Sequence, residues 1–182
     1  RNGLQVIHRL RPYGEGDLGR RVKIVWSGAR VRGRDRLVDW SGGLEVQGNS
    51  ILSAAPLNFW NANHPLERIG SHALAWKSVT TGGTSGVIVR LEEADSGTLK
   101  VNTRQGDVAV DLASIGLEPA VWDLGGLKKE IRIYRLPEHN TASELAFSLP
   151  LTGLHEGDNP IYIRMVQEDE HAAWTSPIYL VL

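Results

Sequence analysis

The sequence predicts an all-β fold, an antiparallel β-sandwich of about ten strands in two packed sheets with little helix. Short runs in which apolar and polar residues alternate recur along the chain, and glycine-rich turns separate them roughly every eight to twelve residues. No window of about twelve residues keeps a helical period, and the best candidate, residues 111–116, suffices for one turn. Strands without long connections pair antiparallel, which favours two facing sheets.

The expected strands share this two-residue alternation. In the first of them Trp26 is in phase with Val22 and Ile24, so this face is expected in the core. In a later strand Arg135 shares a face with two isoleucines. The strands are expected at residues 22–26, 44–47, 51–52, 79–81, 87–91, 98–103, 108–112, 131–135, 161–166 and 176–182.

The chain is expected to consist of a connector, residues 1–19, and one sandwich domain, residues 20–182. A short apolar stretch and a glycine-containing turn precede residue 20. The sequence begins at Arg1 rather than at a methionine, so the connector is expected to join the domain to an upstream region of the same polypeptide.

Charge is divided unequally along the chain. Residues 1–36 carry ten basic and three acidic residues, whereas residues 37–182 carry ten basic and eighteen acidic ones. Four arginines recur at every second position, namely Arg30, Arg32, Arg34 and Arg36. We expect them to form intramolecular or interdomain ion pairs and to dock onto the upstream domain. Nucleic-acid binding is not expected, because the net charge of the chain is −1.

Composition and motifs disfavour several classes of function. Without cysteine the chain has no disulfide framework and no thiolate metal site. The six histidines lack metal-ligand spacing and residues 168–171 lack the pattern of a calcium loop, so no metal and no cofactor is expected. No nucleophile elbow, phosphate loop or dinucleotide motif occurs, which disfavours a free-standing hydrolase and leaves no catalytic residue assigned. No apolar run approaches the roughly 18 residues of a membrane helix, so no membrane partner is expected.

Six tryptophans provide an alternative interpretation. Exposed indoles on a sandwich can stack on sugar rings, as they do in carbohydrate-binding modules. Trp26 and Trp76 are in phase with core residues and are expected to be buried, whereas Trp60 precedes a polar turn and is the best candidate for exposure. Trp60 and Trp122 are therefore the candidate ligand residues of a carbohydrate-binding module. Packing of all six tryptophans in and around the core is the competing interpretation.

Two parts of the sequence carry a resemblance to a known family. The first comprises residues 29–36 and 40–46, where Trp-Ser-Gly-Gly opens the second stretch. The second comprises residues 159–167 and then 173–179, which read Ala-Trp-Thr-Ser-Pro-Ile-Tyr. Together they resemble the C-terminal β-domain of uncharacterised bacterial proteins that carry a metal-dependent phosphoesterase barrel of the polymerase-and-histidinol-phosphatase type upstream.

The resemblance implies that this chain is an accessory domain that follows a catalytic unit. The metal-binding motifs of such a barrel do not occur in this chain, so no catalytic residue is carried over. Within the second matching part, Pro177 favours a strand start or an edge, and Trp174 is expected to cover one end of the core.

We therefore expect a non-catalytic accessory β-sandwich domain, the C-terminal part of a larger bacterial metal-dependent hydrolase. Its expected role is interdomain packing, assembly or substrate access, and its expected partner is the upstream domain of the same polypeptide. A carbohydrate-binding module that uses exposed tryptophans is the alternative.

Overall fold

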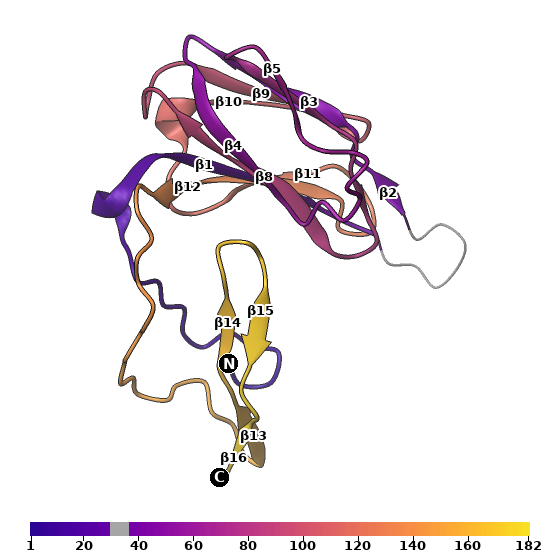
Figure 1. The fold of residues 1–182 in the computed structure, drawn as a ribbon. Helices are drawn as coiled ribbons and strands as arrows, with labels where there is room; N and C mark the ends of the chain where they lie inside the picture. Colours follow the sequence, from indigo (N-terminus) through magenta and orange to yellow (C-terminus); the bar gives the residue numbers. More distant parts are fainter. Residues whose placement is uncertain (30–36) are drawn as a thin grey trace. The chain divides into compact units, whose positions relative to one another are not determined.

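The computed structural model describes residues 1–29 and 37–182, and Figure 1 shows the order of its strands. Two compact units divide the chain. Tyr13–Asn140 form the larger one, called the sandwich unit below, and Arg1–Pro12 together with Thr141–Leu182 form the smaller one, called the terminal unit. The sandwich unit contains two five-stranded antiparallel sheets, which confirms the predicted all-β sandwich.

The first sheet has the strand order β11-β12-β1-β8-β4, with every neighbouring pair antiparallel. Its strands are β1 (Leu18–Ser27), β4 (Ile51–Leu57), β8 (Thr84–Leu91), β11 (Ala120–Asp123) and β12 (Glu130–Pro137). Pro56 lies in β4, which is an edge strand and pairs with β8 alone. Proline has no N–H to donate, and an edge strand tolerates this because it has no second neighbouring strand.

The second sheet has the order β10-β9-β3-β6-β5, again with antiparallel neighbours. Its strands are β3 (Gly42–Gln47), β5 (Glu67–Ile69), β6 (Ala73–Trp76), β9 (Thr98–Thr103) and β10 (Gly106–Asp111). A short pair, β2 (Val38–Asp39) with β7 (Val79–Thr80), and the 3₁₀ turns Glu15–Asp17 and Leu112–Ser114 complete the unit. No helix within residues 1–29 and 37–182 is long and apolar enough to cross a membrane.

The buried hydrophobic side chains of the two sheets form one core cluster. Val22, Ile24 and Trp26 of β1 have no exposed surface and face this core, as their alternation predicts. Leu99 and Val101 of β9 contribute to the same core from the second sheet. Full burial of such a side chain stabilises the fold by about 1.5–3 kcal/mol, so this core is the main source of the sandwich's stability.

Three buried tryptophans form one end of this core. The rings of Trp26 and Trp76 are stacked, with centroids 4.7 Å apart and planes 11° from parallel. Each indole N–H has a buried acceptor: Trp26 donates to Ser78 Oγ, Trp40 to Thr80 Oγ1 and Trp76 to the carbonyl of Trp40. Thr80 lies in β7 and Ser78 directly precedes this strand. The segment around β7 therefore supplies the hydroxyl acceptors for two of the three buried indoles.

The terminal unit joins both ends of the chain through short strand pairs. The strands β13 (Asp158–Ile161) and β16 (Ile178–Val181) pair with each other, as do β14 (Arg164–Val166) and β15 (Ala172–Trp174). Asn159 is fully buried, and its amide accepts from the Nδ2 of Asn2 at 2.8 Å and donates to the carbonyl of His155 at 2.8 Å. The N-terminal residues are therefore part of a folded unit and do not form a bare connector.

These boundaries differ from the expected division at residue 20. The strand β1 already begins at Leu18, and the segment after residue 140 lies outside the sandwich. The side chain of Trp174 is 60% exposed in β15, so the prediction that it covers an end of the core is wrong. Alternation of apolar residues does not indicate which sheet a strand joins.

Candidate functional site

A groove of about 450 Å³ lies on the sandwich unit. Its lining combines one aromatic platform with polar and charged side chains, among them Asp39, Ser41, Trp60, His64, Lys77 and Arg104. The buried Ser78 and the half-buried Val79 line it from the side of β7, next to the tryptophan cluster. The groove is thus a feature of the sandwich alone.

Trp60 is presented to the groove by the chain that leaves β4. The preceding residue, Phe59, packs against the core, with its ring centroid 6.2 Å from that of Trp26. Asn58 adopts a left-handed conformation at φ 54°, and its Nδ2 donates to the carbonyl of Thr84 at 3.0 Å. With Phe59 facing inward, the neighbouring Trp60 is directed outward, and its side chain is 73% exposed.

A hydrogen-bonded turn over residues 61–64 holds the next part of the groove wall. The N–H of His64 donates to the carbonyl of Asn61 at 3.0 Å, and the N–H of Asn63 donates to Asn61 Oδ1 at 3.0 Å. Because the N–H of Asn63 needs an acceptor, the side-chain atom of Asn61 that it contacts is the amide oxygen. The other side-chain atom, Asn61 Nδ2, therefore lies 3.2 Å from His64 Nδ1. An amide nitrogen donates, so His64 Nδ1 accepts and the neutral ring carries its proton on Nε2.

Another part of the lining is built around Asp39. Its Oδ1 accepts from the N–H of Ser41 at 2.8 Å, and its Oδ2 pairs with Arg104 Nη1 at 2.6 Å. Burial alone raises the pKa of Asp39, but the hydrogen bonds from Ser41 and the charge of Arg104 outweigh it, so this pKa lies below its ordinary value. Asp39 is therefore an ionised positioning group, unsuited to act as a general acid near neutral pH.

Lys77 and Trp60 are two side chains of the groove that have no partner among the described residues. Within the part of the chain that the structure describes, neither makes a hydrogen bond, an ion pair or a ring contact. Lys77 and Arg104 supply two positive charges against the single carboxylate of Asp39. The groove therefore has an excess of positive charge beside an exposed aromatic face.

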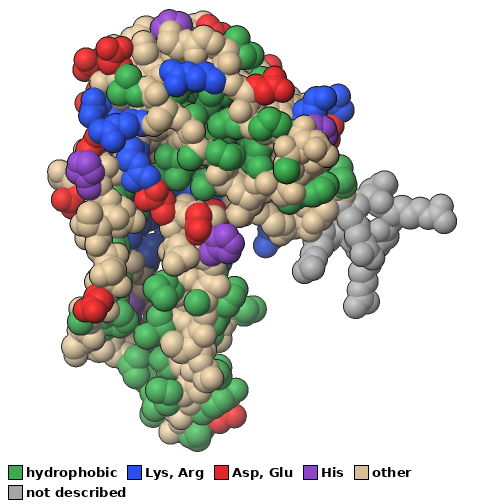
Figure 2. All heavy atoms as spheres, in the orientation of Figure 1, with side chains coloured by type: hydrophobic (Ala, Val, Ile, Leu, Met, Phe, Trp, Pro, Cys, Tyr) green, Lys and Arg blue, Asp and Glu red, His purple; other side chains and the backbone are tan. Residues whose placement is uncertain are grey.

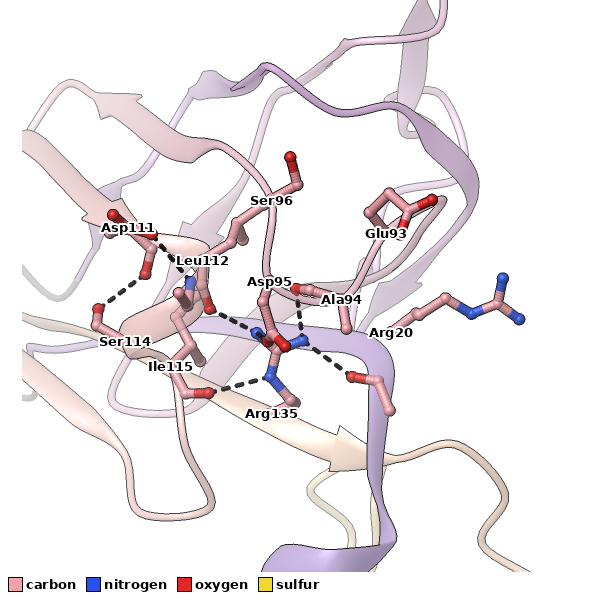
Figure 3. A network of polar contacts seen from close by, with 12 residues as sticks. Arg20, Glu93, Ala94, Asp95, Ser96, Asp111, Leu112, Ser114, Ile115 and Arg135 are labelled. Carbon is pink, nitrogen blue, oxygen red and sulfur yellow. Dashed lines mark hydrogen bonds and ion pairs between the residues drawn. The ribbon is translucent and has the colours of Figure 1, made fainter.

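A second polar cluster surrounds Arg135 on β12 (Figure 3). Its side chain is 4% exposed and lies at one end of the core, in phase with Ile131 and Ile133. The guanidinium donates to the carbonyls of Gly19 at 2.9 Å, Ala94 at 2.8 Å, Leu112 at 2.5 Å and Ile115 at 3.0 Å. These bonds join four loops and strand ends, which makes Arg135 a structural residue and leaves little capacity for a ligand.

The charge of this cluster is balanced by Asp95, whose Oδ1 lies 3.2 Å from Arg135 Nη2. Burial lowers the pKa of Arg135, and the Asp95 carboxylate raises it in part. A guanidinium stays protonated in proteins, so the buried positive charge persists at every physiological pH. Nearby, Asp111 caps the 3₁₀ turn by accepting from the N–H of Ala113 at 3.0 Å, as Figure 3 shows.

The structure brings only one of the predicted site residues into the groove. Trp60 lines it, whereas Trp122 lies on β11 and packs against the core of the sandwich. The predicted docking arginines Arg30, Arg32, Arg34 and Arg36 lie outside the described residues. Among residues 1–29 and 37–182, no group of three or more His, Cys, Asp or Glu side chains could hold a metal ion.

The sequence analysis missed the polar residues of the groove. Lys77 directly follows the buried Trp76, and Arg104 follows β9, so neither stands out from ordinary surface charges in the sequence. Asp39 and Arg104 lie 65 positions apart and meet only because β2 and the end of β9 converge. For Arg135 a signal existed, since a cation in phase with two core isoleucines predicts a buried charge that needs partners.

Comparison with known proteins gave no family assignment. No family model matches the chain, and no curated protein or solved structure matches it either. The resemblance to the C-terminal domain of phosphoesterase-barrel proteins therefore stays a prediction from residues 29–46 and 159–179.

Proposed function

We propose that this chain is a non-catalytic accessory module of a larger protein, in which the terminal unit packs against the domain upstream. The observation that supports this proposal is the lack of any buried hydrophobic side chain among the residues of the terminal unit. Its two buried residues, Asn2 and Asn159, are polar. A β-structure of this kind has no hydrophobic core of its own.

The hydrophobic side chains of the terminal unit lie on its surface instead. Fifteen of the twenty-one exposed large hydrophobic residues of the described chain belong to this unit. Figure 2 shows the hydrophobic side chains gathered over β13 to β16. Those on or beside these strands are Ile163, Met165, Val166, Trp174, Ile178, Tyr179, Val181 and Leu182. Isolated two-stranded pairs are at best marginally stable in water, so a covering surface stabilises them.

An extended segment of the terminal unit provides further support. Leu145, Phe147, Leu149 and Leu151 alternate with other residues, and all four are exposed. This spacing is typical of a strand with one apolar face, yet residues 141–152 form no strand within the described chain. Such a segment is suited to add to a sheet edge of a neighbouring domain, where main-chain hydrogen bonds and apolar pockets would hold it.

The partner that we propose is the upstream domain of the same polypeptide. The sequence resemblance implies a metal-dependent phosphoesterase barrel there, with the metal ligands and catalytic residues of the reaction in the barrel. The role of the present chain would then be interdomain packing, assembly or control of substrate access. We include in this proposal that the chain docks onto the upstream domain through four arginines, and the support for this part is their spacing in the sequence. These residues are Arg30, Arg32, Arg34 and Arg36.

Hydrogen exchange measured by mass spectrometry tests the proposal on the full-length gene product and on the 182-residue chain. We expect amides of β13 to β16 to exchange at least about tenfold more slowly in the full-length protein. In that protein, Met165→Glu together with Ile178→Glu should remove the additional protection. The control is Leu52→Glu, an exposed apolar position of β4, which should leave it intact.

Two results would contradict the proposal. One is equal exchange of these strands in both proteins, since a covering domain must slow their opening. The other is a gene product without any further domain.

A further inference from the structure

We propose that the groove beside Trp60 binds an acidic saccharide, that is, an oligosaccharide with a carboxylate on its sugar ring. This site belongs to the sandwich unit, so the proposal does not depend on what covers the terminal unit. It rests on three features of the groove: an indole without a partner among the described residues, an excess of positive charge, and fixed polar groups in its lining.

The indole of Trp60 is suited to stack on a sugar ring. It is 73% exposed, although Trp26, Trp40 and Trp76 of the same unit are each less than 5% exposed. The N–H of each buried indole has a protein acceptor, whereas that of Trp60 has none among the described residues. A flat apolar face with a free N–H at its edge matches a pyranose, which presents C–H groups on its face and hydroxyls at its rim.

The platform is held in place before any ligand arrives. Phe59 anchors the chain to the core on one side of Trp60, and the hydrogen-bonded turn of Asn61 and His64 holds it on the other. Fixing the main chain in this way lowers the entropy that binding would otherwise cost. The proton on His64 Nε2 provides a donor for a hydroxyl oxygen within the same wall.

The charges of the groove distinguish an acidic sugar from a neutral one. The carboxylate of Asp39 is already occupied by Ser41 and Arg104, so it cannot neutralise Lys77 as well. Lys77 has no acidic partner among the described residues, and the Arg104 side chain is 70% exposed while only its Nη1 is held by Asp39. Both cations line the groove, which favours an anionic ring over a neutral ring of the same shape.

Calorimetric titration of the 182-residue chain tests this proposal. The probes are short oligomers of galacturonate, alginate and hyaluronan, and the matched neutral probe is the methyl ester of the same oligogalacturonate. We expect at least one acidic oligomer to bind and its affinity to fall by about tenfold in Trp60→Ala, since one stacking contact is lost. Trp174→Ala removes an indole that is 60% exposed in the terminal unit and should leave the affinity unchanged.

A second pair of variants isolates the charge. Lys77→Met should weaken binding of the acidic oligomer by about fivefold to tenfold and leave binding of any neutral ester unchanged. Lys128→Met, at another exposed lysine, should change neither. Circular dichroism of each variant should match the parent chain, because all four side chains are at the surface.

The outcomes separate the parts of the proposal. Absence of binding across the three acidic oligomers overturns the saccharide site. Equal affinity for an acidic oligomer and its ester overturns the requirement for a carboxylate. Equally tight binding of polyglutamate shows that charge alone is recognised and overturns the role of the sugar ring. None of these results bears on the packing of the terminal unit, which the exchange experiment tests separately.

Discussion

The guanidinium of Arg135 and the carboxylate of Asp95 form an ion pair of 3.2 Å in which the arginine side chain is 4% exposed and the aspartate side chain 73% exposed. The two partners therefore contribute to stability in different ways. Arg135 is held mainly by four backbone carbonyls, and Asp95 supplies charge from the solvent side.

Replacing the buried partner should destabilise the sandwich strongly. Arg135→Met leaves the carbonyl of Ile115 without its guanidinium donor and that of Leu112 with the N–H of Ile115 alone, and we expect the free energy of unfolding to fall by about 3 kcal/mol. Asp95→Asn should cost less than about 1 kcal/mol, because solvent screens the attraction of the exposed carboxylate and Arg135 keeps its four carbonyl acceptors. Urea unfolding followed by circular dichroism measures both values, and a larger loss for Asp95→Asn would contradict this assignment.

Thr80 provides a second test of buried polar pairing. Its hydroxyl accepts from Trp40 Nε1 at 2.8 Å and donates to the carbonyl of Gly28 at 3.0 Å. Thr80→Val leaves the indole N–H of Trp40 unpaired in the aromatic cluster and the carbonyl of Gly28 with the N–H of Gly82 as its remaining donor, so it should cost about 1–3 kcal/mol. In a Trp40→Phe background the same change should cost less, since one of the two groups is then absent. Equal costs in the two backgrounds would show that this hydrogen bond contributes nothing.

Two glycines predict a sharp difference between two alanine substitutions: Gly42, at the start of β3, and Gly83, in the turn before β8. A Cβ at Gly42 would collide with the backbone of Asn102 and Thr103 on β9, whereas a Cβ at Gly83 meets nothing within 4 Å. We expect Gly42→Ala to lower the free energy of unfolding by about 2 kcal/mol or more, because the two strands must move apart. Gly83→Ala should be neutral or slightly stabilising. Thermal unfolding of the two variants measures the contrast, and similar melting temperatures would contradict it.

Glu138 should make the stability of the sandwich depend on pH. The N–H of Arg20 donates to its Oε2 at 2.8 Å, and the guanidinium groups of Arg20 and Arg90 pair with its Oε1. The backbone hydrogen bond from Arg20, and then the charges of both arginines, hold the pKa of Glu138 below its ordinary value. A carboxyl whose pKa is lower in the folded state stabilises that state above its unfolded pKa, about 4.3, and loses this contribution as pH falls through the folded value.

The variant Glu138→Gln isolates this effect. At pH 7 it should lower the free energy of unfolding by about 1 kcal/mol, a value kept small by the partly exposed arginines. The difference from the parent chain should shrink as the pH is lowered from about 5 to about 3. Urea unfolding at several pH values measures it, and a difference that stays constant over this range would exclude Glu138 as the titrating group.

Much of the fold could be predicted because alternation is a local property of the chain. The core positions Val22, Ile24 and Trp26 follow from their spacing alone, and all three are fully buried. The candidate site was predicted only in part. Exposure of Trp60 could be inferred from the polar turn that follows it, but Trp122 occupies a similar sequence context and packs on the core. Exposure of an aromatic residue depends on what packs beside it, and short sequence windows do not contain that information.

The sequence by itself determined the all-β class, the antiparallel sandwich and the inward face of strands such as β1, because these follow from side chains a few residues apart. The strands β5, β11 and β15 were not expected from it. Only the tertiary structure decided that residues 141–182 leave the sandwich and join the N-terminal residues, and that Asp39, Trp60, Lys77 and Arg104 surround one groove. The reason is physical. Both outcomes depend on contacts between residues far apart in the chain, and the burial and charge of those contacts exist only after the strands have assembled.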